Sequence, residues 1–406
     1  MIGRADPRHA PGRAGDIVTA LALSAFGFAN LALPAEAQQV EGVHYLLIVM
    51  GVLGLTVLVR LKSSLATPRA WLISSGIVLG VLPGFLVAQD TEYGVQKLQT
   101  MVLIVLSILA ASSMRDSRLG TAWMAGTGFG IALLFALLVV FGGVMAENGR
   151  VSVLGLNPVG VARLTALGAA IAAVLLLAMA GRRPLQRLAL VAAVLMCVAA
   201  TVITGSRGPL LAAAVAVLIG LFSITTGRGA RVLWALLAVG ALGLAVQFGW
   251  IDPSTGLGWA TSRADAGRSD LYAEAFRVMT TQPLGVGWGN FGSVYGWTDG
   301  GLYPHNLYLE VGAEGGLLAL AVFAVLTVLS LIWAVRNYRR SQSPIDLLLL
   351  AIYVYAVVNA QFSSDIVGNR MLWMAIAFVI ARGMTTLAPS GPHRGGVASA
   401  APAREG

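Results

Sequence analysis

The sequence predicts an all-α, polytopic integral membrane protein with about twelve transmembrane helices and one large loop. Of its 406 residues, 57% are hydrophobic and only 11% are charged, whereas a soluble domain carries about 25% charged residues. Apolar runs of about 17 or more residues, long enough to span a bilayer as a helix, recur along the whole chain. The sequence lacks the alternating segments of about ten residues that build a membrane β-barrel.

The apolar runs are expected to form a single membrane domain over residues 1–406. Short connectors separate them, and neither a soluble domain nor an internal repeat interrupts them. A long polar interval, 251–305, follows the ninth run and is expected to form the large loop. The expected helices lie at about 17–33, 44–60, 70–88, 98–113, 121–145, 161–180, 188–204, 209–225, 232–250, 306–335, 345–362 and 371–387.

The first apolar run, 17–33, has two interpretations. Basic residues precede it and Ala35-Glu36-Ala37 follows it, as at a signal-peptidase site. The run is slightly longer than the hydrophobic core of a signal peptide, which is about 7–15 residues. An uncleaved first helix is therefore the favoured interpretation.

The distribution of basic residues predicts the orientation. With the N-terminus in the cytoplasm and alternating sides, 19 of the 27 lysines and arginines fall on the cytoplasmic side, although the largest loop lies opposite. Cytoplasmic loops are enriched in Lys and Arg, so both termini are expected to be cytoplasmic. This distribution accounts for the net charge of +9 without nucleic acid as a partner.

Eight basic residues fall on the face where positive charge is usually avoided. Several stand at expected helix ends, where a single one could be an interfacial anchor. As a set they favour a shared anionic ligand. They are Lys97, Arg150, Arg163, Arg207, Arg263, Arg268, Arg277 and Arg370.

Two of these arginines stand at tight helix starts. The segment 204–209 (TGSRGP) joins two expected helices with almost no loop, and Arg163 follows the Asn157-Pro158 turn. Free N–H groups at a helix N-terminus favour an anion, so an arginine there is consistent with a phosphate site. A tight turn carrying an arginine that serves only topology is the alternative.

Within the large loop, Ser269 is expected to cap a helix that runs to about Thr280. Arg268 would stand at the start of that helix, and Arg263 lies just upstream. The residues expected on one face of it are Leu271, Ala275, Phe276 and Met279.

His305, one of four histidines, lies where the loop meets the tenth expected helix. A lone histidine is usually structural, but nearby cations would keep its imidazole neutral and able to accept a proton. The sequence shows neither metal-ligand spacing nor a second cysteine beside Cys197, so no metal and no cofactor is expected. It also shows no charged residue deep inside an apolar run, as ion-coupled transport usually requires.

Three segments together resemble the O-antigen ligase family and its wider ligase/polymerase superfamily. They are Gly205-Ser206-Arg207-Gly208, Arg268-Ser269-Asp270-Leu271, and Pro304-His305-Asn306 with the following 307–318 (LYLEVGAEGGLL). A glycine-rich segment, 283–289 (PLGVGWG), lies between the arginine and the histidine, as in the family. These motifs span about residues 200–330.

The resemblance implies a metal-independent, inverting glycosyltransferase of the bacterial inner membrane, with its active site in the periplasmic loop. The donor would be O-antigen linked to undecaprenyl diphosphate, and the acceptor a sugar of the lipid A–core in lipopolysaccharide assembly. In this interpretation His305 is the general base, and Arg207 and Arg268 hold the diphosphate. Lys97, Arg163 and Arg263 would be further phosphate or glycan contacts, whereas Arg150, Arg277 and Arg370 are expected to be topological or structural.

Three alternatives remain. An O-antigen polymerase shares the donor, but commonly carries a second sizeable arginine-bearing loop, and here the other candidate, 146–160, is short. A protein O-oligosaccharyltransferase of the same superfamily is the second. A lipid-linked saccharide flippase, the third, would be expected to line a cavity at mid-membrane with polar groups, whereas this sequence puts them at helix ends.

Overall fold

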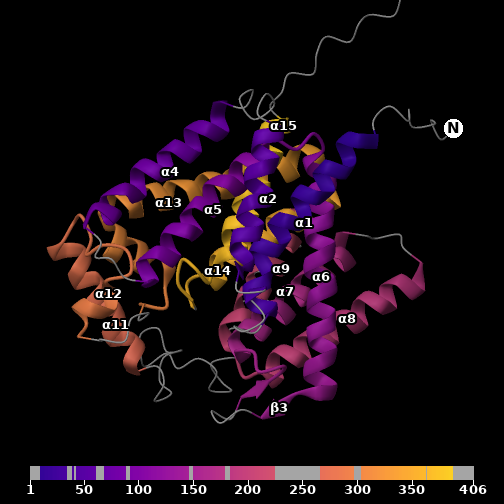
Figure 1. Cartoon of the computed structure of the whole chain (residues 1–406). Coiled ribbons are helices and arrows are strands. Elements are labelled where there is room, and N and C mark those ends of the chain that lie inside the picture. Colours follow the sequence, from indigo (N-terminus) through magenta and orange to yellow (C-terminus); the bar gives the residue numbers. More distant parts are fainter. Residues whose placement is uncertain are drawn as a thin grey trace, which may run out of the picture.

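The computed structural model describes residues 10–33, 39–40, 43–60, 68–87, 92–145, 150–178, 183–224, 266–296, 303–362 and 364–386. These residues are mainly helical (Figure 1). The helix expected at 232–250 and the residue Arg263 lie outside them. The longer helices are α1 (Ala10–Ala32), α2 (Tyr45–Val59), α4 (Pro68–Val87), α5 (Glu92–Ser112), α6 (Ser117–Gly142), α7 (Pro158–Ala178), α8 (Pro184–Ile203), α9 (Arg207–Ile224), α11 (Ala266–Thr281), α13 (Leu307–Ser341), α14 (Pro344–Asn359) and α15 (Arg370–Thr386).

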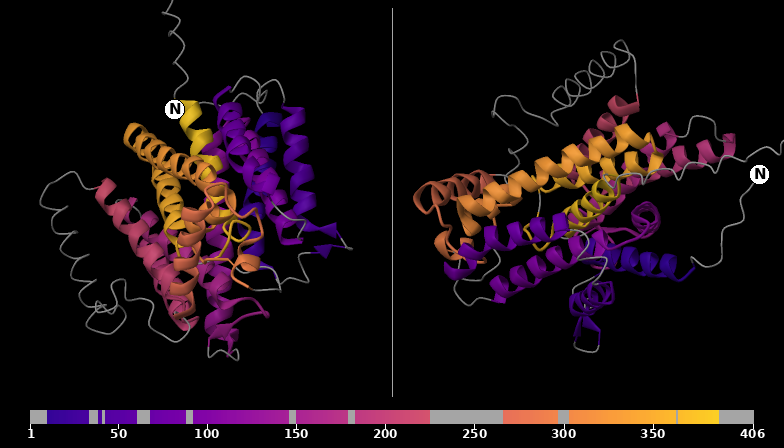
Figure 2. Two further views of the ribbon diagram at one scale, coloured as in Figure 1. Left: turned by 90° about the vertical axis from the view of Figure 1, so that its left-hand side faces the viewer. Right: turned by 90° about the horizontal axis from the view of Figure 1, so that it is seen from above.

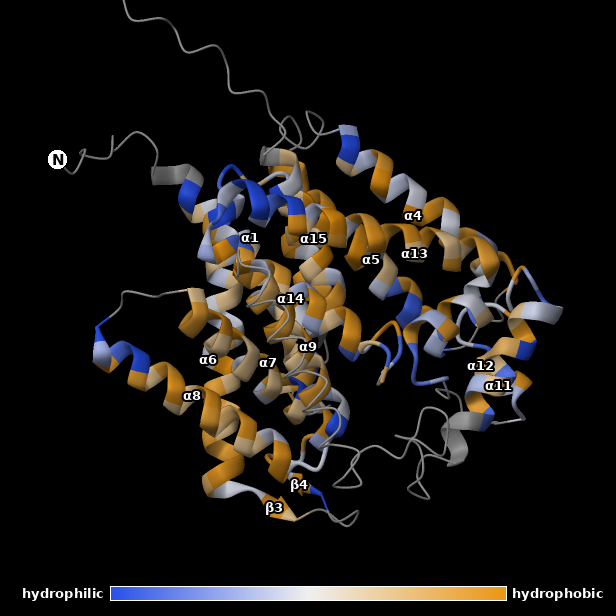
Figure 3. Ribbon diagram, turned by 180° about the vertical axis from the view of Figure 1, so that it is seen from behind, coloured by the Kyte–Doolittle hydropathy of each residue, from blue (hydrophilic) through white to orange (hydrophobic). Residues whose placement is uncertain are grey.

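The predicted class, an all-α polytopic membrane protein, is confirmed, whereas the count of about twelve transmembrane helices stays a prediction. Among the described residues, eight helices are long and apolar enough to cross a membrane, and α2 and α14 are shorter apolar helices. Large apolar side chains such as Leu72, Leu86 and Leu185 are exposed on the helix surfaces, as a lipid-facing exterior requires. Hydrophilic residues gather towards helix ends and in the connections (Figure 3).

The remaining elements are short. The helix α12 covers Phe291–Val294. Two hairpins of two-residue strands connect helices, β1 (Gln39–Val40) with β2 (Val43–His44), and β3 (Val144–Met145) with β4 (Val151–Ser152).

The core of the bundle is formed by α7, α14 and α15. Their apolar residues are buried on nearly all sides, so these helices are interior ones rather than amphipathic ones. Small residues allow close packing, as where Gly168 of α7 approaches Ala132 of α6. The helices α4 and α13 lie side by side, with α11 and α12 at one end of the pair (Figures 1 and 2).

The first helix is an integral part of the bundle. Leu23 and Phe26 of α1 are fully buried. Near the other end of α1 the buried Asp16 lies 2.6 Å from a guanidinium nitrogen of Arg60 and accepts a hydrogen bond from the backbone N–H of Asp116 at 2.9 Å. These contacts tie the start of α1 to the end of α2 and to the start of α6.

The expected continuous helix at 306–335 is interrupted. α13 extends to Ser341, but Gly316 has φ 82° and ψ 178°, so the chain breaks there into two helical segments. The N–H of Leu317 donates to the carbonyl of Pro283 at 2.9 Å instead of to its own helix. Glycine adopts this backbone region without steric cost.

The helix of the large loop differs from the expected one in two ways. α11 begins at Ala266, so Ser269 lies inside its first turn rather than at its N-cap. Leu271, Ala275 and Met279 are buried as expected, but Phe276 is 63% exposed and Val278 is buried instead. The buried face therefore turns towards α13, against which α11 packs.

Candidate active site

One end of the bundle collects the N-terminal ends of α5, α7, α9, α13 and α15 with the C-terminal ends of α1 and α14. Asn30, near the end of α1, donates to the carbonyl of Gly368 before α15 at 3.2 Å. The N–H of Leu307, the first residue of α13, donates to the carbonyl of Ala360 after α14 at 3.0 Å. Antiparallel neighbours thus place residues that are far apart in sequence at one level.

His305 lies in a turn held against the end of α14. Its φ of 56° is in the left-handed region, which non-glycine residues rarely adopt and which clusters at functional sites. Asn306 caps α13 by accepting from the N–H of Tyr308 at 3.0 Å, and its amide donates to the carbonyl of Gln361 at 3.4 Å. The His305 ring is partly buried, with its centre 4.4 Å from that of Tyr303.

The turn that carries Arg207 lies against the same segment. Gly205 supplies a positive φ of 70° between α8 and α9, and Arg207 begins α9. A Cβ on Gly208 would lie 3.0 Å from the Cβ of Phe362, which follows Gln361. The Arg207 side chain is exposed and makes no hydrogen bond or ion pair with the residues that the structure describes. The starts of α9 and α13 therefore flank residues 360–362, with the exposed side chain of Arg207 at the first of them.

Arg163 is buried at this end, with 2% of its surface exposed. Its guanidinium donates to Oδ1 of Asn369 at 2.7 Å and to the carbonyl of Gly368 at 3.3 Å, while its Nε finds no partner within the described chain. It lies near enough to Tyr303 and Asp365 for an electrostatic interaction. The described residues give it no direct carboxylate partner, so its charge is only partly compensated.

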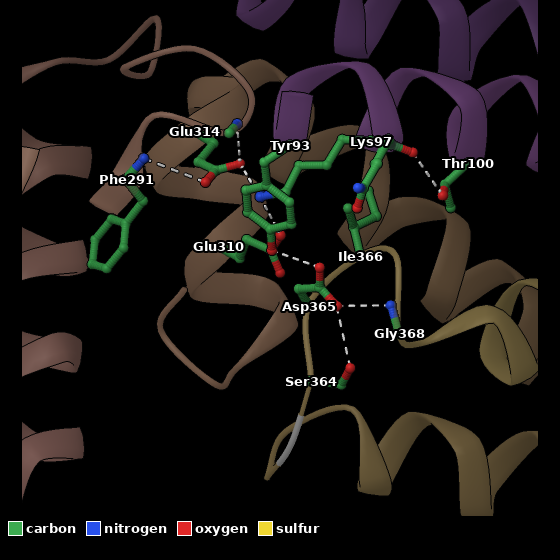
Figure 4. A network of polar contacts seen from close by, with 12 residues as sticks. Tyr93, Lys97, Thr100, Phe291, Glu310, Glu314, Ser364, Asp365, Ile366 and Gly368 are labelled. Carbon is green, nitrogen blue, oxygen red and sulfur yellow. Dashed lines mark hydrogen bonds and ion pairs between the residues drawn. The ribbon is translucent and has the colours of Figure 1, made fainter. Parts of the chain in front are cut away.

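Lys97 has a different environment from the one expected. It is fully buried, and its ammonium lies 2.8 Å from Oε1 of Glu310 and in contact with Glu314, both of which are fully buried (Figure 4). It also stands over the ring of Tyr93, 4.2 Å from the ring centre. An ammonium with two carboxylate partners and no exposed surface does not fit the phosphate or glycan contact that the sequence suggested.

Glu310, Glu314 and Asp365 form, with Lys97 and Tyr93, a buried polar cluster that the sequence analysis missed. The Tyr93 hydroxyl donates to Oδ2 of Asp365 at 2.5 Å, and the N–H of Gly368 donates to Oδ1 at 2.7 Å. A signal was present in the sequence, since glutamates four residues apart in an apolar helix lie on one face and need a cationic partner when buried. The expectation that apolar runs hold no internal charge was therefore wrong.

The glycine-rich segment packs on the break in α13. The N–H groups of Val286 and Gly287 donate to the carbonyls of Ala313 and Glu314 at 2.9 and 3.0 Å. These carbonyls lack partners within their own helix because it ends at the break. Gly285, with φ 81°, lies so close that a Cβ would be 2.3 Å from the carbonyl oxygen of Glu314.

The indole of Trp288 holds the glycine-rich segment 283–289 against α4. Its Nε1–H donates to the carbonyl of Val81 at 2.9 Å, and its backbone N–H donates to Gly84 at 3.2 Å. The side chain is fully buried and fills the space beside Gly84 and Gly315. The segment is therefore held between α4 and the first part of α13.

The remaining basic residues of the expected set lie on α11, at the start of α15 and beside Gly205. Arg268 is in the first turn of α11, and its side chain is not described. Arg277 is exposed and donates to Glu274 at 2.5 and 2.8 Å, and these hydrogen bonds lower the pKa of Glu274. Arg370 is buried with its guanidinium against the Tyr45 hydroxyl. Arg150 lies near Gly205.

The fold and this site define an all-α polytopic membrane protein with cationic side chains at the helix ends of one level. Over the described residues, no group of three or more His, Cys, Asp or Glu side chains could hold a metal ion. The model of a protein family described as O-antigen ligase matches residues 191–324, which confirms the resemblance found in the sequence. About a third of the chain is thus similar to the O-antigen ligase family.

The matched stretch includes Arg207, Arg268, His305, Glu310 and Glu314, and excludes Lys97 and Arg163. A search of curated proteins found no match to the chain.

Proposed function

We propose that the protein is a metal-independent, inverting glycosyltransferase that moves O-antigen polysaccharide from undecaprenyl diphosphate onto a sugar of the lipid A–core. The observation that carries this proposal is the placement of two turns. The turn of His305 and the turn of Arg207 lie on either side of residues 360–362. A base and a phosphate-binding cation from different helices can therefore serve one ligand.

The chemistry suits these residues. A diphosphate is a stable leaving group, so its departure needs fixed positive charge rather than a proton donor. Arginine supplies that charge at any physiological pH and can grip two phosphate oxygens at once. We assign this role to Arg207 and Arg268, with Arg163 and Arg263 as further contacts to phosphate or glycan.

His305 is proposed as the general base. A neutral imidazole accepts the proton of the acceptor hydroxyl while that oxygen attacks the anomeric carbon of the donor sugar. Attack from the face opposite the diphosphate inverts that carbon. The partly buried ring and the left-handed turn that fixes it are consistent with a residue that is held for a reaction.

We place this end of the bundle in the periplasm and both termini in the cytoplasm of a bacterial inner membrane. The support is the distribution of lysine and arginine along the sequence. At the opposite end two buried aspartates pair with arginines, Asp346 with Arg382 at 2.8 Å and Asp16 with Arg60 at 2.6 Å. The donor lipid would then reach the site from the outer leaflet.

Analysis of lipopolysaccharide by gel electrophoresis tests the reaction. Cells that lack the gene are compared with the same cells carrying either the wild-type gene or His305→Ala. Loss of a ligase leaves lipid A–core without O-chains while lipid-linked polymer accumulates. A core carrying one repeat unit would instead indicate a polymerase. Normal lipopolysaccharide with unglycosylated proteins would indicate a protein O-oligosaccharyltransferase.

A further inference from the structure

The helical segment that follows His305 is separate from the long part of α13. Gly316 breaks the helix, so residues 307–315 form a short segment with its own direction. Helical geometry therefore does not fix the position of His305 relative to residues 317–341. Tyr308 contacts that long part, with its ring centre 4.7 Å from that of Phe323 and its hydroxyl 2.9 Å from Oγ1 of Thr327. Further contacts join the short segment to other helices.

Two of these contacts are made by buried carboxylates. Glu310 and Glu314 lie one turn apart and both contact Lys97 of α5. Glu314 also accepts hydrogen bonds from the backbone N–H of Gly289 at 2.9 Å and of Phe291 at 3.4 Å. A single lysine thus fastens the short segment to α5, and Glu314 fastens it to the glycine-rich segment (Figure 4).

The helix α5 also contacts the loop before α15, and this loop contacts Arg163. Tyr93, one turn before Lys97, donates to Asp365, and Asp365 accepts from the N–H of Gly368. The carbonyl of Gly368 in turn accepts from Arg163. The N-terminal end of α5 therefore contacts both the short segment 307–315 that follows His305 and the loop that contacts the buried Arg163.

We propose that Lys97 is a positioning residue, which holds His305 in register with the arginines through Glu310 and Glu314 and does not itself touch the donor. This inference rests on the proposed function. Its physical basis is that both carboxylates are fully buried, so loss of the lysine leaves them without a cation. They must then take up protons or move, and either change releases the short segment from α5.

The decisive variants are Lys97→Met and the nearly isosteric Glu314→Gln, which leaves no cavity. In purified protein, each is expected to lower the single-turnover rate of transfer about 10- to 100-fold, as small misplacements of a reacting group do. The Kd for the lipid-diphosphate donor should change less than about threefold. A lysine that binds phosphate predicts the reverse, with weakened donor binding.

Arg277→Met is the matched control, because it removes an exposed cation whose partner, Glu274, lies one turn away on the same helix. This control is expected to leave both the single-turnover rate of transfer and the Kd for the donor unchanged. The effect of Lys97→Met is then measured again in a His305→Ala background. If Lys97 acts through His305, its loss should lower the residual rate less than about threefold there, since residues that act as a unit are not additive. Equal losses in both backgrounds would overturn the proposal.

Hydrogen–deuterium exchange tests the positioning without any reaction. Lys97→Met should accelerate exchange in residues 303–315 and 286–292 while the protection of α6 stays unchanged. Unchanged exchange in residues 303–315 would refute the positioning role even if transfer were lost. The wild-type protein could transfer no glycan while Lys97→Met still accelerates exchange in residues 303–315. That result would support the positioning of the His305 turn and would refute only the proposed function.

Discussion

The guanidinium of Arg163 in α7 donates a hydrogen bond to Oδ1 of Asn369, 2.7 Å away at the start of α15. Both side chains are buried, and Asn369 is itself held by its amide, which donates to the carbonyl of Asp365 at 2.8 Å. The contact therefore ties a buried cation to the loop that precedes α15 and that also contacts Tyr93 of α5.

Replacing this arginine should lower stability. Arg163→Met would remove the charged donor from Oδ1 of Asn369 and from the carbonyl of Gly368, which still accepts from Asn30, and a hydrogen bond to a charged group contributes about 1.5–3 kcal/mol. Thermal unfolding in detergent should show a lower Tm for this variant, whereas Arg277→Met should leave the Tm unchanged. An unaltered Tm in Arg163→Met would show that Asn369 finds another donor.

Lysine should not maintain the transfer activity at the two arginine positions that we assign to binding of the diphosphate. Arg207→Lys and Arg268→Lys keep the positive charge but lose the planar fork that binds two phosphate oxygens. We expect both variants to fold and to lose most of their transfer activity in a reconstituted assay. Near-normal transfer by both would refute the phosphate-binding role, because an arginine that serves only topology accepts lysine.

Removal of the His305 imidazole should affect rate rather than binding. His305→Ala is expected to bind the donor almost normally and to transfer glycan about 10²–10⁴-fold more slowly. His305→Gln keeps a polar side chain, but its amide does not accept a proton near neutral pH, so this variant should be as slow as His305→Ala. If either folded variant transfers at close to the wild-type rate, another group is the base.

The intact enzyme should lose activity as the pH falls. A general base must be unprotonated to accept the hydroxyl proton, so the rate is highest at neutral and alkaline pH and declines as the imidazole becomes protonated. The single-turnover rate measured against pH checks this, with unfolding followed in parallel. A rate that stays constant on acidification, in folded protein, would contradict the assignment.

The proposed orientation can be tested by labelling single cysteines in a Cys197→Ala background. Ser293→Cys and Arg339→Cys lie at exposed positions near opposite ends of the bundle. A membrane-impermeant thiol reagent added to cells with a permeabilised outer membrane should label position 293 and leave position 339 unlabelled. The opposite result would reverse the topology.

The sequence by itself determined the fold class. Apolar length fixes which segments can be membrane helices, because every backbone polar group in a bilayer must be satisfied within a helix. The placement of Arg163, Arg207 and His305 next to helix starts was likewise readable from local signals such as Pro158, Gly205 and Asn306.

The tertiary structure decided which of these residues are free and which are paired. The sequence put Lys97 with the phosphate contacts, but Glu310 and Glu314, more than two hundred residues away, surround it. Local pattern cannot reveal such a partner, because the pairing depends on how α5 packs against α13. The break at Gly316 was also hidden, since a glycine within an apolar run ends a helix only when another segment, here residues 283–287, supplies the hydrogen bonds that the break leaves open.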